Sequence, residues 1–353
     1  YKKDNAALEP FAAADILMPA GKRTLSQWVK FANSLRLRLA IRVSMSAPDL
    51  ARAEVAKAMD ATAGGVLESA DETVAVSTES GYKNPLGTVN EGWGEVFMGA
   101  TMESVLVGYN DPRLIKYYSK AEGGDIKDEK GNLIIAERNK IAGTYKGVPQ
   151  GTGVTVKDEN RYRLHSKSTI TKQTDAILMT AAEVWFLRAE AALRGFTSEN
   201  VKDCYEKGIT VSCQQWGVNV GDYLTSDATP SDYVDAFEAK YDVKALIKVT
   251  PKWDGGASPE EQLERILTQK WIACYPEGYE AWTDQRRTGY PQLFKVFVNN
   301  SGGAIDTNIR IRRLPYPSDI QKNNPTQYSA LKKALGGEDN GGTRLWWDTG
   351  RNF

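Results

Sequence analysis

The stretch Trp271–Pro291, WIACYPEGYEAWTDQRRTGYP, combines aromatic and charged side chains at helical spacing. Tyr275 follows Trp271 by four residues and Trp282 follows Tyr275 by seven, so these aromatic residues are expected to share one stripe of a helix. Glycine is common just after the end of a helix, and proline cannot continue one. The helix is therefore expected to end near Thr288–Gly289.

A second stripe of this helix carries acids and bases within pairing distance. Glu280 and Asp284 are one helical turn apart, and Arg286 and Arg287 follow closely. In one interpretation Glu280 and Asp284 are the paired carboxylates of a glycoside hydrolase, although such carboxylates must flank the scissile bond. In the other, the acids neutralise Arg286 and Arg287 in a structural ion-pair network. We favour the structural role for all four residues, because adjacent arginines with nearby acids more often stabilise a fold than catalyse a reaction.

Length and charge limit the classes of function. The chain has 353 residues, enough for one large domain or two, and a net charge of zero. A balanced charge argues against nucleic acid as a partner. No apolar run approaches the roughly 20 residues that a membrane-spanning helix needs.

Cysteine and histidine are too few for the common enzyme and metal sites. Cys204, Cys213 and Cys274 lack CxxC spacing, so we expect small buried side chains rather than zinc ligands or disulfides. A catalytic triad would have to use the only histidine, His165, and no G-x-S-x-G accompanies it. Phosphate-loop and dinucleotide glycine patterns are absent as well. The sequence thus predicts no catalysis, metal or cofactor, with His165 at the surface or hydrogen-bonded.

Two helix hairpins are predicted from apolar periodicity. The first spans about residues 26–63, with Ser26 as the candidate cap and Pro48 in the connecting turn. The second spans about residues 176–213 and resembles a tetratricopeptide-type hairpin, in which alanine and glycine let two helices approach. Segment 66–170 is rich in turns, with short hairpins expected after residue 121, and segment 214–353 mixes helices with loops.

Several strings in this order resemble the SusD/RagB-like family of outer-membrane nutrient-binding lipoproteins. FANSLRLR at residues 31–38 is the most specific, and Tyr275–Gly289 matches the family's late helix. DPRL at 111–114, YKGVPQG at 145–151 and the alanine-rich hairpin at 176–213 also match. The resemblance covers the chain from Ser26 to its C-terminus.

The resemblance implies a mainly α fold, an αα superhelix of tetratricopeptide-like hairpins with a loop-rich binding face and a few short β-hairpins. It implies one domain over residues 1–353. It also implies a lipoprotein on the outer face of the outer membrane, anchored through an upstream cysteine, that delivers oligosaccharides or other nutrients to a SusC-like TonB-dependent transporter. Because stacked hairpins stabilise one another and only two are clear here, further helices are expected N-terminal to Tyr1.

Three classes of function remain open: a glycan-binding module of an uptake system, a helical-repeat scaffold that binds peptides or proteins, and a glycoside hydrolase. In a glycan site, aromatic rings cover the apolar faces of sugars while amide and charged groups bind the hydroxyls. The candidate ligand-binding residues are those of the irregular segments: Tyr82, Asn84, Trp93, Tyr109, Tyr145, Trp216 and Trp253.

Overall fold

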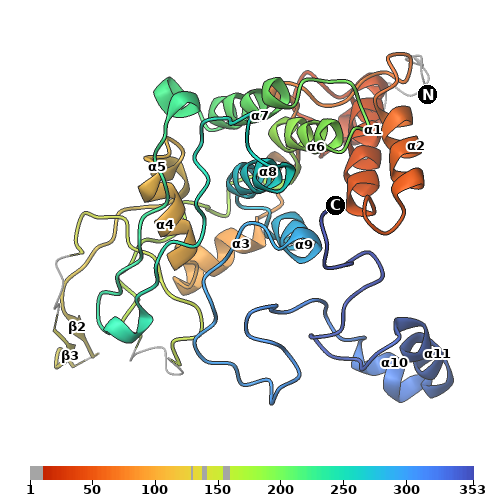
Figure 1. Ribbon diagram of the computed structural model, residues 1–353. Coiled ribbons are helices and arrows are strands. Elements are labelled where there is room, and N and C mark those ends of the chain that lie inside the picture. Colours follow the sequence, from red (N-terminus) through yellow and green to blue (C-terminus); the bar gives the residue numbers. More distant parts are fainter. Residues whose placement is uncertain (1–10, 129, 137–140, 154–159) are drawn as a thin grey trace.

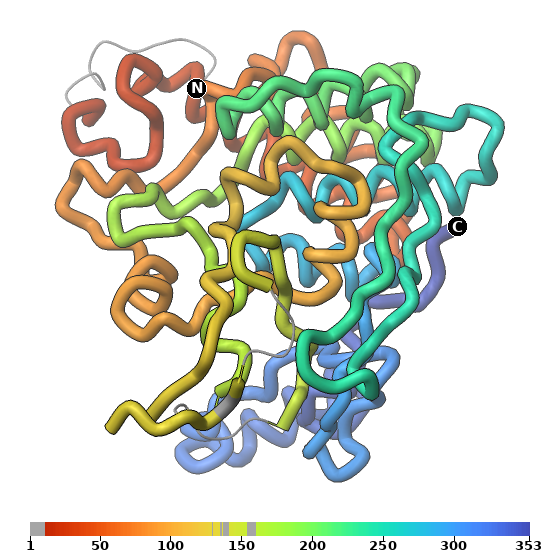
Figure 2. The backbone as a smooth tube through the Cα atoms, turned by 90° about the vertical axis from the view of Figure 1, so that its left-hand side faces the viewer, coloured from red at the N-terminus to blue at the C-terminus, as the bar shows by residue number. Residues whose placement is uncertain are grey.

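The computed structural model describes residues 11–128, 130–136, 141–153 and 160–353. A layer of helices occupies one side of the molecule, and loops with the C-terminal segment occupy the other (Figure 1). Figure 2, turned by 90°, shows the blue C-terminal segment below the same helical layer. No helix within the described residues is long and apolar enough to cross a membrane. The assignment of residues 1–353 to one domain stays a prediction.

The first predicted hairpin is confirmed, with shifted ends. Helix α1 spans Leu25–Arg42 and α2 spans Pro48–Ala58. The cap of α1 is Thr24 rather than Ser26, because the Thr24 hydroxyl accepts from the backbone N–H of Gln27. After α2, the Asn33 side chain binds the carbonyls of Ala63 and Gly65 and so ties the end of the hairpin to α1.

The second hairpin consists of α6 (Ala181–Leu193) and α7 (Val201–Gln215). Each helix has a side-chain cap, Thr180 for α6 and Asn200 for α7. The helices approach closely at Gly208, where an added Cβ would lie 2.8 Å from the Phe186 ring. This contact explains the small residue, and the tetratricopeptide-like packing predicted for this region is confirmed.

Short strands connect the loops to the helices. Strand β1 (Val74–Val76) pairs antiparallel with β4 (Ala176–Met179), which leads directly into α6. Strands β2 (Ile126–Lys127) and β3 (Leu133–Ile135) form the hairpin expected after residue 121. Parts of the loop-rich segment 66–170 lie outside the described residues.

The remaining helices surround this framework. In the loop-rich segment, α3 (Pro85–Gly87) continues into a π-helical turn at Thr88–Trp93, and α4 (Ala100–Gly108) precedes α5 (Leu114–Tyr117). In the C-terminal segment, α8 (Pro259–Ala273) begins at a Ser258 capping box, and α9 spans Gly278–Thr288. Helices α10 (Ser318–Asn323) and α11 (Pro325–Leu335) lie at the edge of the molecule (Figure 1).

The prediction of one aromatic stripe over Trp271–Trp282 is wrong, because two helices share that stretch. Helix α8 ends at Ala273 and α9 begins at Gly278, with Pro276 between them. The Tyr275 ring stacks on Tyr117 at 4.3 Å between centroids, whereas Tyr279 is exposed. The predicted end is confirmed: α9 stops at Thr288, and Gly289 follows with φ 82°.

Candidate functional site

The predicted ligand-binding residues differ in how far they are exposed. Trp93 and Tyr82 are 58% and 37% exposed, and neither ring contacts another aromatic ring within the described residues. The partly buried Tyr145, Trp216 and Trp253 pack against the main hydrophobic core. Trp93 and Tyr82 are therefore the candidates with the largest area open to a ligand.

Tyr109 and Asn84 do not face solvent, so their interpretation as surface contacts needs correction. Tyr109 is 1% exposed, and its hydroxyl donates to the carbonyl of Val249 at 2.6 Å. Asn84 is 4% exposed, caps α3 and donates to the carbonyl of Thr174. The polar groups of both side chains are hydrogen-bonded within the fold.

Glu280 and Asp284 belong to a buried network of charges rather than to an open cleft. Lys270 of α8 lies between them, with Nζ 2.7 Å from Asp284 and 3.3 Å from Glu280. Glu280 also pairs with Arg42 of α1. Burial would raise the pKa of Asp284, but Lys270 and Arg287 outweigh it and hold this pKa at about 2. A carboxylate held ionised in this way is poorly suited to general-acid catalysis.

The two arginines have different partners, which corrects the predicted pairing. Arg287 binds Asp284 at 2.9 Å, as expected, and also Glu190 of α6 at 2.6 Å. Arg286 forms no ion pair with an acid in the described chain. Its guanidinium donates to the carbonyl of Arg312 and covers the ring of Trp282 at 3.6 Å. Burial, together with the nearby Arg312, lowers the pKa of Arg286 to about 10.

The opposite face of α9 borders a cavity of about 680 Å³, here called the indole–amide cavity. Residues 278, 281, 282 and 285 of α9 line it, at the spacing of one helical stripe, whereas the charged network uses residues 280, 284 and 287. Its volume is that of a site for a small ligand. The lining residues also include Trp271 of α8, Gln150, and the side chains Leu293, Val296, Val298, Asn299, Asn300, Ser301, Ile305, Asp306, Thr307, Arg310 and Ile311.

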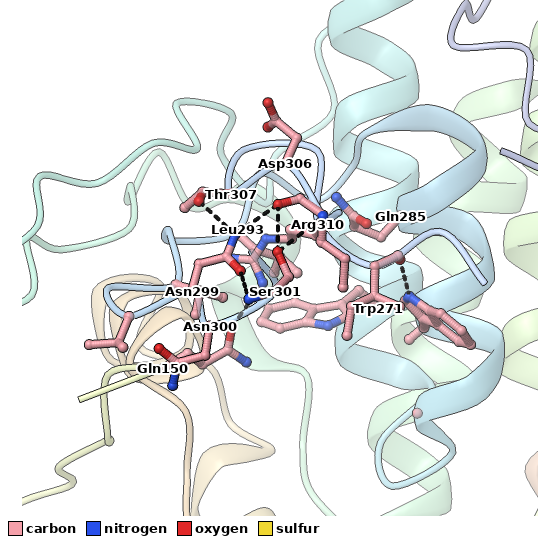
Figure 3. A pocket seen from close by; sticks show the side chains of 17 residues that line it. Gln150, Trp271, Gln285, Leu293, Asn299, Asn300, Ser301, Asp306, Thr307 and Arg310 are labelled. Carbon is pink, nitrogen blue, oxygen red and sulfur yellow. Dashed lines mark hydrogen bonds between the residues drawn. The ribbon is translucent and has the colours of Figure 1, made fainter. Parts of the chain in front are cut away.

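The loop wall of the indole–amide cavity is held by its own hydrogen bonds. The Asn299 amide donates to the carbonyl of Ile305 at 2.8 Å and to the hydroxyl of Thr307 at 3.0 Å. Arg310 has the left-handed φ of 69° that is uncommon for arginine, and its Nη1 donates to Gln150 at 2.8 Å. Figure 3 shows Asn299, Ser301 and Thr307 on this loop and Trp271 and Gln285 on the helices facing it.

Two indoles supply flat apolar area to the cavity. Trp271 is half-buried near the end of α8, where it packs against the main hydrophobic core and also lines the cavity. Trp282 donates from Nε1 to the carbonyl of Ile311 at 3.1 Å, which fixes its ring, and Arg286 covers one of its faces. The ring can therefore contact a ligand through its other face or an edge. Because rings with fixed orientation lose little entropy on binding, this arrangement suits stacking against a sugar.

The sequence reasoning missed most of this cavity. Trp271 and Trp282 were assigned to a single stripe, and Gln285 and the loop at residues 293–311 were not considered. A local signal existed: Gly278, Ala281, Trp282 and Gln285 form an uncharged stripe on an otherwise charged helix. The other wall is the loop at residues 293–311, which turns back against α8 and α9. The periodicity of the sequence does not predict this contact between distant segments.

His165 is neither at the surface nor hydrogen-bonded, contrary to expectation. It is 1% exposed, and neither ring nitrogen has a partner in the described chain. Tyr162 and Phe237 surround it at ring-centroid distances of 5.1 and 5.8 Å. Burial, with a smaller contribution from Lys146, lowers its pKa to about 3.

This buried histidine predicts acid-sensitive stability. An unfolded histidine has a pKa near 6.5, so between pH 6.5 and about 3 the unfolded chain binds a proton that the folded chain excludes. The stability contribution of His165 is complete above pH 6.5 and is lost as the pH falls toward 3. The free energy of unfolding should decrease by about 1.4 kcal/mol for each pH unit in this window. Urea unfolding of wild type and His165→Leu at several pH values measures the effect, and equal slopes for the two proteins would contradict it.

Cys204, Cys213 and Cys274 are free and buried, as predicted. Among the described residues no group of three or more histidine, cysteine, aspartate or glutamate side chains could hold a metal ion. The indole–amide cavity is lined by aromatic, amide and aliphatic side chains.

Comparison with known proteins gives the family. A SusD-like family model, described as Susd and RagB outer membrane lipoprotein, matches residues 8–348. The chain therefore belongs to the SusD-like family, whose members are outer-membrane lipoproteins that bind ligands and are not enzymes. This confirms both the resemblance and the prediction of a non-enzymatic chain.

Solved structures agree with this assignment. A SusD homologue from Bacteroides vulgatus is 50% identical with a TM-score of 0.85, covering 98% of this chain and 69% of that one. A chitin-binding SusD homologue from Flavobacterium johnsoniae is 37% identical with a TM-score of 0.85, covering 97% and 67%. A homologue from Bacteroides thetaiotaomicron is 32% identical with a TM-score of 0.83, covering 98% and 69%. A search of curated proteins found no match.

Proposed function

We propose that this protein binds oligosaccharides in the indole–amide cavity. The observation that carries the proposal is the combination of two oriented indoles with amide side chains in one preformed cavity of about 680 Å³. Sugars present apolar C–H faces beside polar hydroxyls, and aromatic rings with a few placed polar groups complement both. The chitin-binding relative from Flavobacterium johnsoniae supports a carbohydrate as the ligand class.

Family membership supports a proposal for the cellular role. As part of this proposal, the protein is anchored by lipid through a cysteine upstream of the present sequence and faces outward from the outer membrane. It passes its ligand to a SusC-like TonB-dependent transporter. Pull-down of the full-length protein from native membranes should recover such a barrel, whereas recovery of a cytoplasmic complex would refute the location.

Binding can be tested by calorimetric titration with cello-, malto- and chito-oligosaccharides. Trp271→Ala should weaken binding of the oligosaccharide that binds wild type by about 1–3 kcal/mol, because it removes one of the two indoles. Trp346→Ala is a matched control, since this indole is exposed and does not line the cavity. Equal affinities of wild type and Trp271→Ala would move the site away from the cavity.

Trp93 is a second candidate contact, favoured by its exposure. A π-helical turn carries it, and Asn90 of that turn donates to the carbonyls of Ser168 and Ile170, so the backbone below the ring is held in place. If Trp93 stacks on a sugar, Trp93→Ala should lower affinity by about 1–3 kcal/mol while leaving the melting curve unchanged. A large loss of stability would instead identify a packing role. Full affinity would remove Trp93 from the binding surface.

Peptide binding is the alternative. If the protein is instead a helical-repeat scaffold for peptides, calorimetric titration with unstructured peptides should show a heat of binding. Titration with each of the oligosaccharides should then show none. Glu280 and Asp284 are both bonded to Lys270, in keeping with their structural role. Incubation of the protein with polysaccharides should therefore release no reducing ends, and activity that disappears in Glu280→Ala would contradict this.

A further inference from the structure

Arg310 brings a positive charge without an acidic partner to the indole–amide cavity. Its Nη1 donates to the neutral amide oxygen of Gln150 at 2.8 Å, and its Nη2 is enclosed with no hydrogen-bond partner in the described chain. Burial lowers the pKa of Arg310, and no carboxylate of the described residues forms an ion pair with it. Arg312, two residues later, is paired with Asp348 at 2.6 Å. Buried polar groups are nearly always hydrogen-bonded and buried charges nearly always paired, so Arg310 calls for a reason.

The backbone keeps Arg310 in this place in an unfavourable conformation. Its φ of 69° lies in the left-handed region, which arginine seldom adopts. Its N–H donates to the carbonyl of Asp306 at 2.8 Å, which closes the turn over residues 306–310 and holds this conformation. Residues kept in sparsely populated backbone regions are concentrated at binding and catalytic sites. The strain and the unpaired cation therefore point to the same residue.

Asp306 is the other charged residue that lines the cavity, and it does not neutralise Arg310. Its carboxylate accepts from the backbone N–H groups of Ile309 and Asn308, which hold its pKa below the usual range. The side chain is exposed, and in Figure 3 its carboxylate points away from Gln150. Water screens an exposed carboxylate, so the positive charge of Arg310 persists on the Gln150 side of the cavity.

The Gln150 amide oxygen occupies the position at Nη1 that an acidic oxygen can take. Gln150 is exposed, so its side chain can move aside without opening the core. A hydrogen bond from a guanidinium to an anionic oxygen is roughly twice as strong as one to a neutral oxygen. A carboxylate or sulfate also offers a second oxygen, which matches the two parallel N–H groups at the end of a guanidinium.

We propose that Arg310 makes the cavity selective for acidic oligosaccharides. The carboxylate of a uronic acid, or a sulfate ester, replaces the Gln150 amide oxygen at Nη1 and gives Nη2 its missing partner, while the sugar ring stacks on an indole of the cavity. Neutral oligosaccharides stack on the same indoles but leave Arg310 without an acidic partner, so they bind more weakly. The inference rests on the proposed function, because it names the ligand class of the same cavity.

Calorimetric titration of wild type can compare ligands that differ only in charge. Tetragalacturonate carries carboxylates, and its methyl ester is the uncharged counterpart. A κ-carrageenan tetrasaccharide carries sulfate esters without carboxylates, and its desulfated form is the second counterpart. At least one acidic ligand should bind about tenfold to hundredfold more tightly than its neutral counterpart, the gain expected from hydrogen bonds to a charged group. The pair that shows this gain identifies the acidic group as carboxylate or sulfate.

Arg310→Gln tests whether Arg310 causes the preference. The variant should bind the acidic ligand and its neutral counterpart with similar affinity, because only the charged contact is lost. Its melting temperature should equal or exceed that of wild type, since it removes an enclosed cation that lacks an acidic partner. Arg351→Gln is the matched control, because Arg351 is exposed and does not line the cavity, and it should keep the full preference.

The possible failures are distinguishable. Equal affinities for the acidic and neutral members of both pairs in wild type would overturn this inference and leave the proposed function standing. A preference that survives in Arg310→Gln would do the same. If Arg310→Gln melts at a lower temperature and loses acidic and neutral ligands alike, Arg310 is structural and the inference is also wrong. Failure of wild type to bind any oligosaccharide, acidic or neutral, would overturn the proposed function as well.

Discussion

Replacing Arg287 by alanine is expected to lower the free energy of unfolding by about 3–5 kcal/mol, because it breaks a buried ion pair by removing one partner. Arg287 is almost fully enclosed and joins Glu190 of α6 to Asp284 of α9. Burial opposes its charge, yet Glu190 and Asp284 raise its pKa above the usual range, so the cation persists at every pH of interest. Without the Arg287 cation, the carboxylates of Glu190 and Asp284 stay buried and each loses a positively charged partner. Urea unfolding at pH 7 measures the loss.

The control for Arg287→Ala is Arg36→Ala. Arg36 also pairs with an acid, Glu54, but its side chain is 46% exposed, so the pair is partly screened by water. This variant should unfold close to wild type. If Arg287→Ala also unfolds like wild type but loses oligosaccharide binding, Arg287 is a site residue and its structural assignment is wrong.

The hairpins were predictable because their determinants are local. Apolar residues at helical spacing, capping residues and glycine stops identify α1–α2 and α6–α7 to within a few residues. The break between α8 and α9 was missed because the spacing from Trp271 to Trp282 was counted across Pro276. A proline in an apparent helix is itself a local signal, and giving it priority over the aromatic spacing would have separated the two helices.

The candidate site was harder to predict because its walls come from distant segments. Gln150, Gln285 and Arg310 line one cavity although they are far apart in sequence. The loop aromatics are candidates for either core packing or a ligand, and the sequence does not decide between these for any one of them. Tyr109 is core, because an irregular segment can still pack its rings inward. Charge dominated the interpretation of α9, so the one uncharged polar side chain among Asp284–Arg287 escaped notice.

The DPRL string at residues 111–114 has a structural explanation in Arg113, which is fully buried. Its guanidinium binds Asp111 through Nε at 2.9 Å and Nη2 at 2.6 Å. It also donates to Ser212 of α7 and to Gln269 of α8. One side chain thus joins the start of α5 to two helices of the main layer, and Gln269 lies two residues before Trp271 of the cavity.

Arg113→Met is therefore expected to lower the free energy of unfolding by about 3–5 kcal/mol, since methionine fills much of the volume but leaves the Asp111 carboxylate buried without its cation. Urea unfolding of Arg113→Met, Asp111→Asn and the double variant completes a double-mutant cycle. If the loss comes from the uncompensated charge, the double variant should be clearly less destabilised than the sum of the single ones, because it removes both charges together. Simple additivity would mean that Arg113 acts through its packing and its bonds to Ser212 and Gln269 instead.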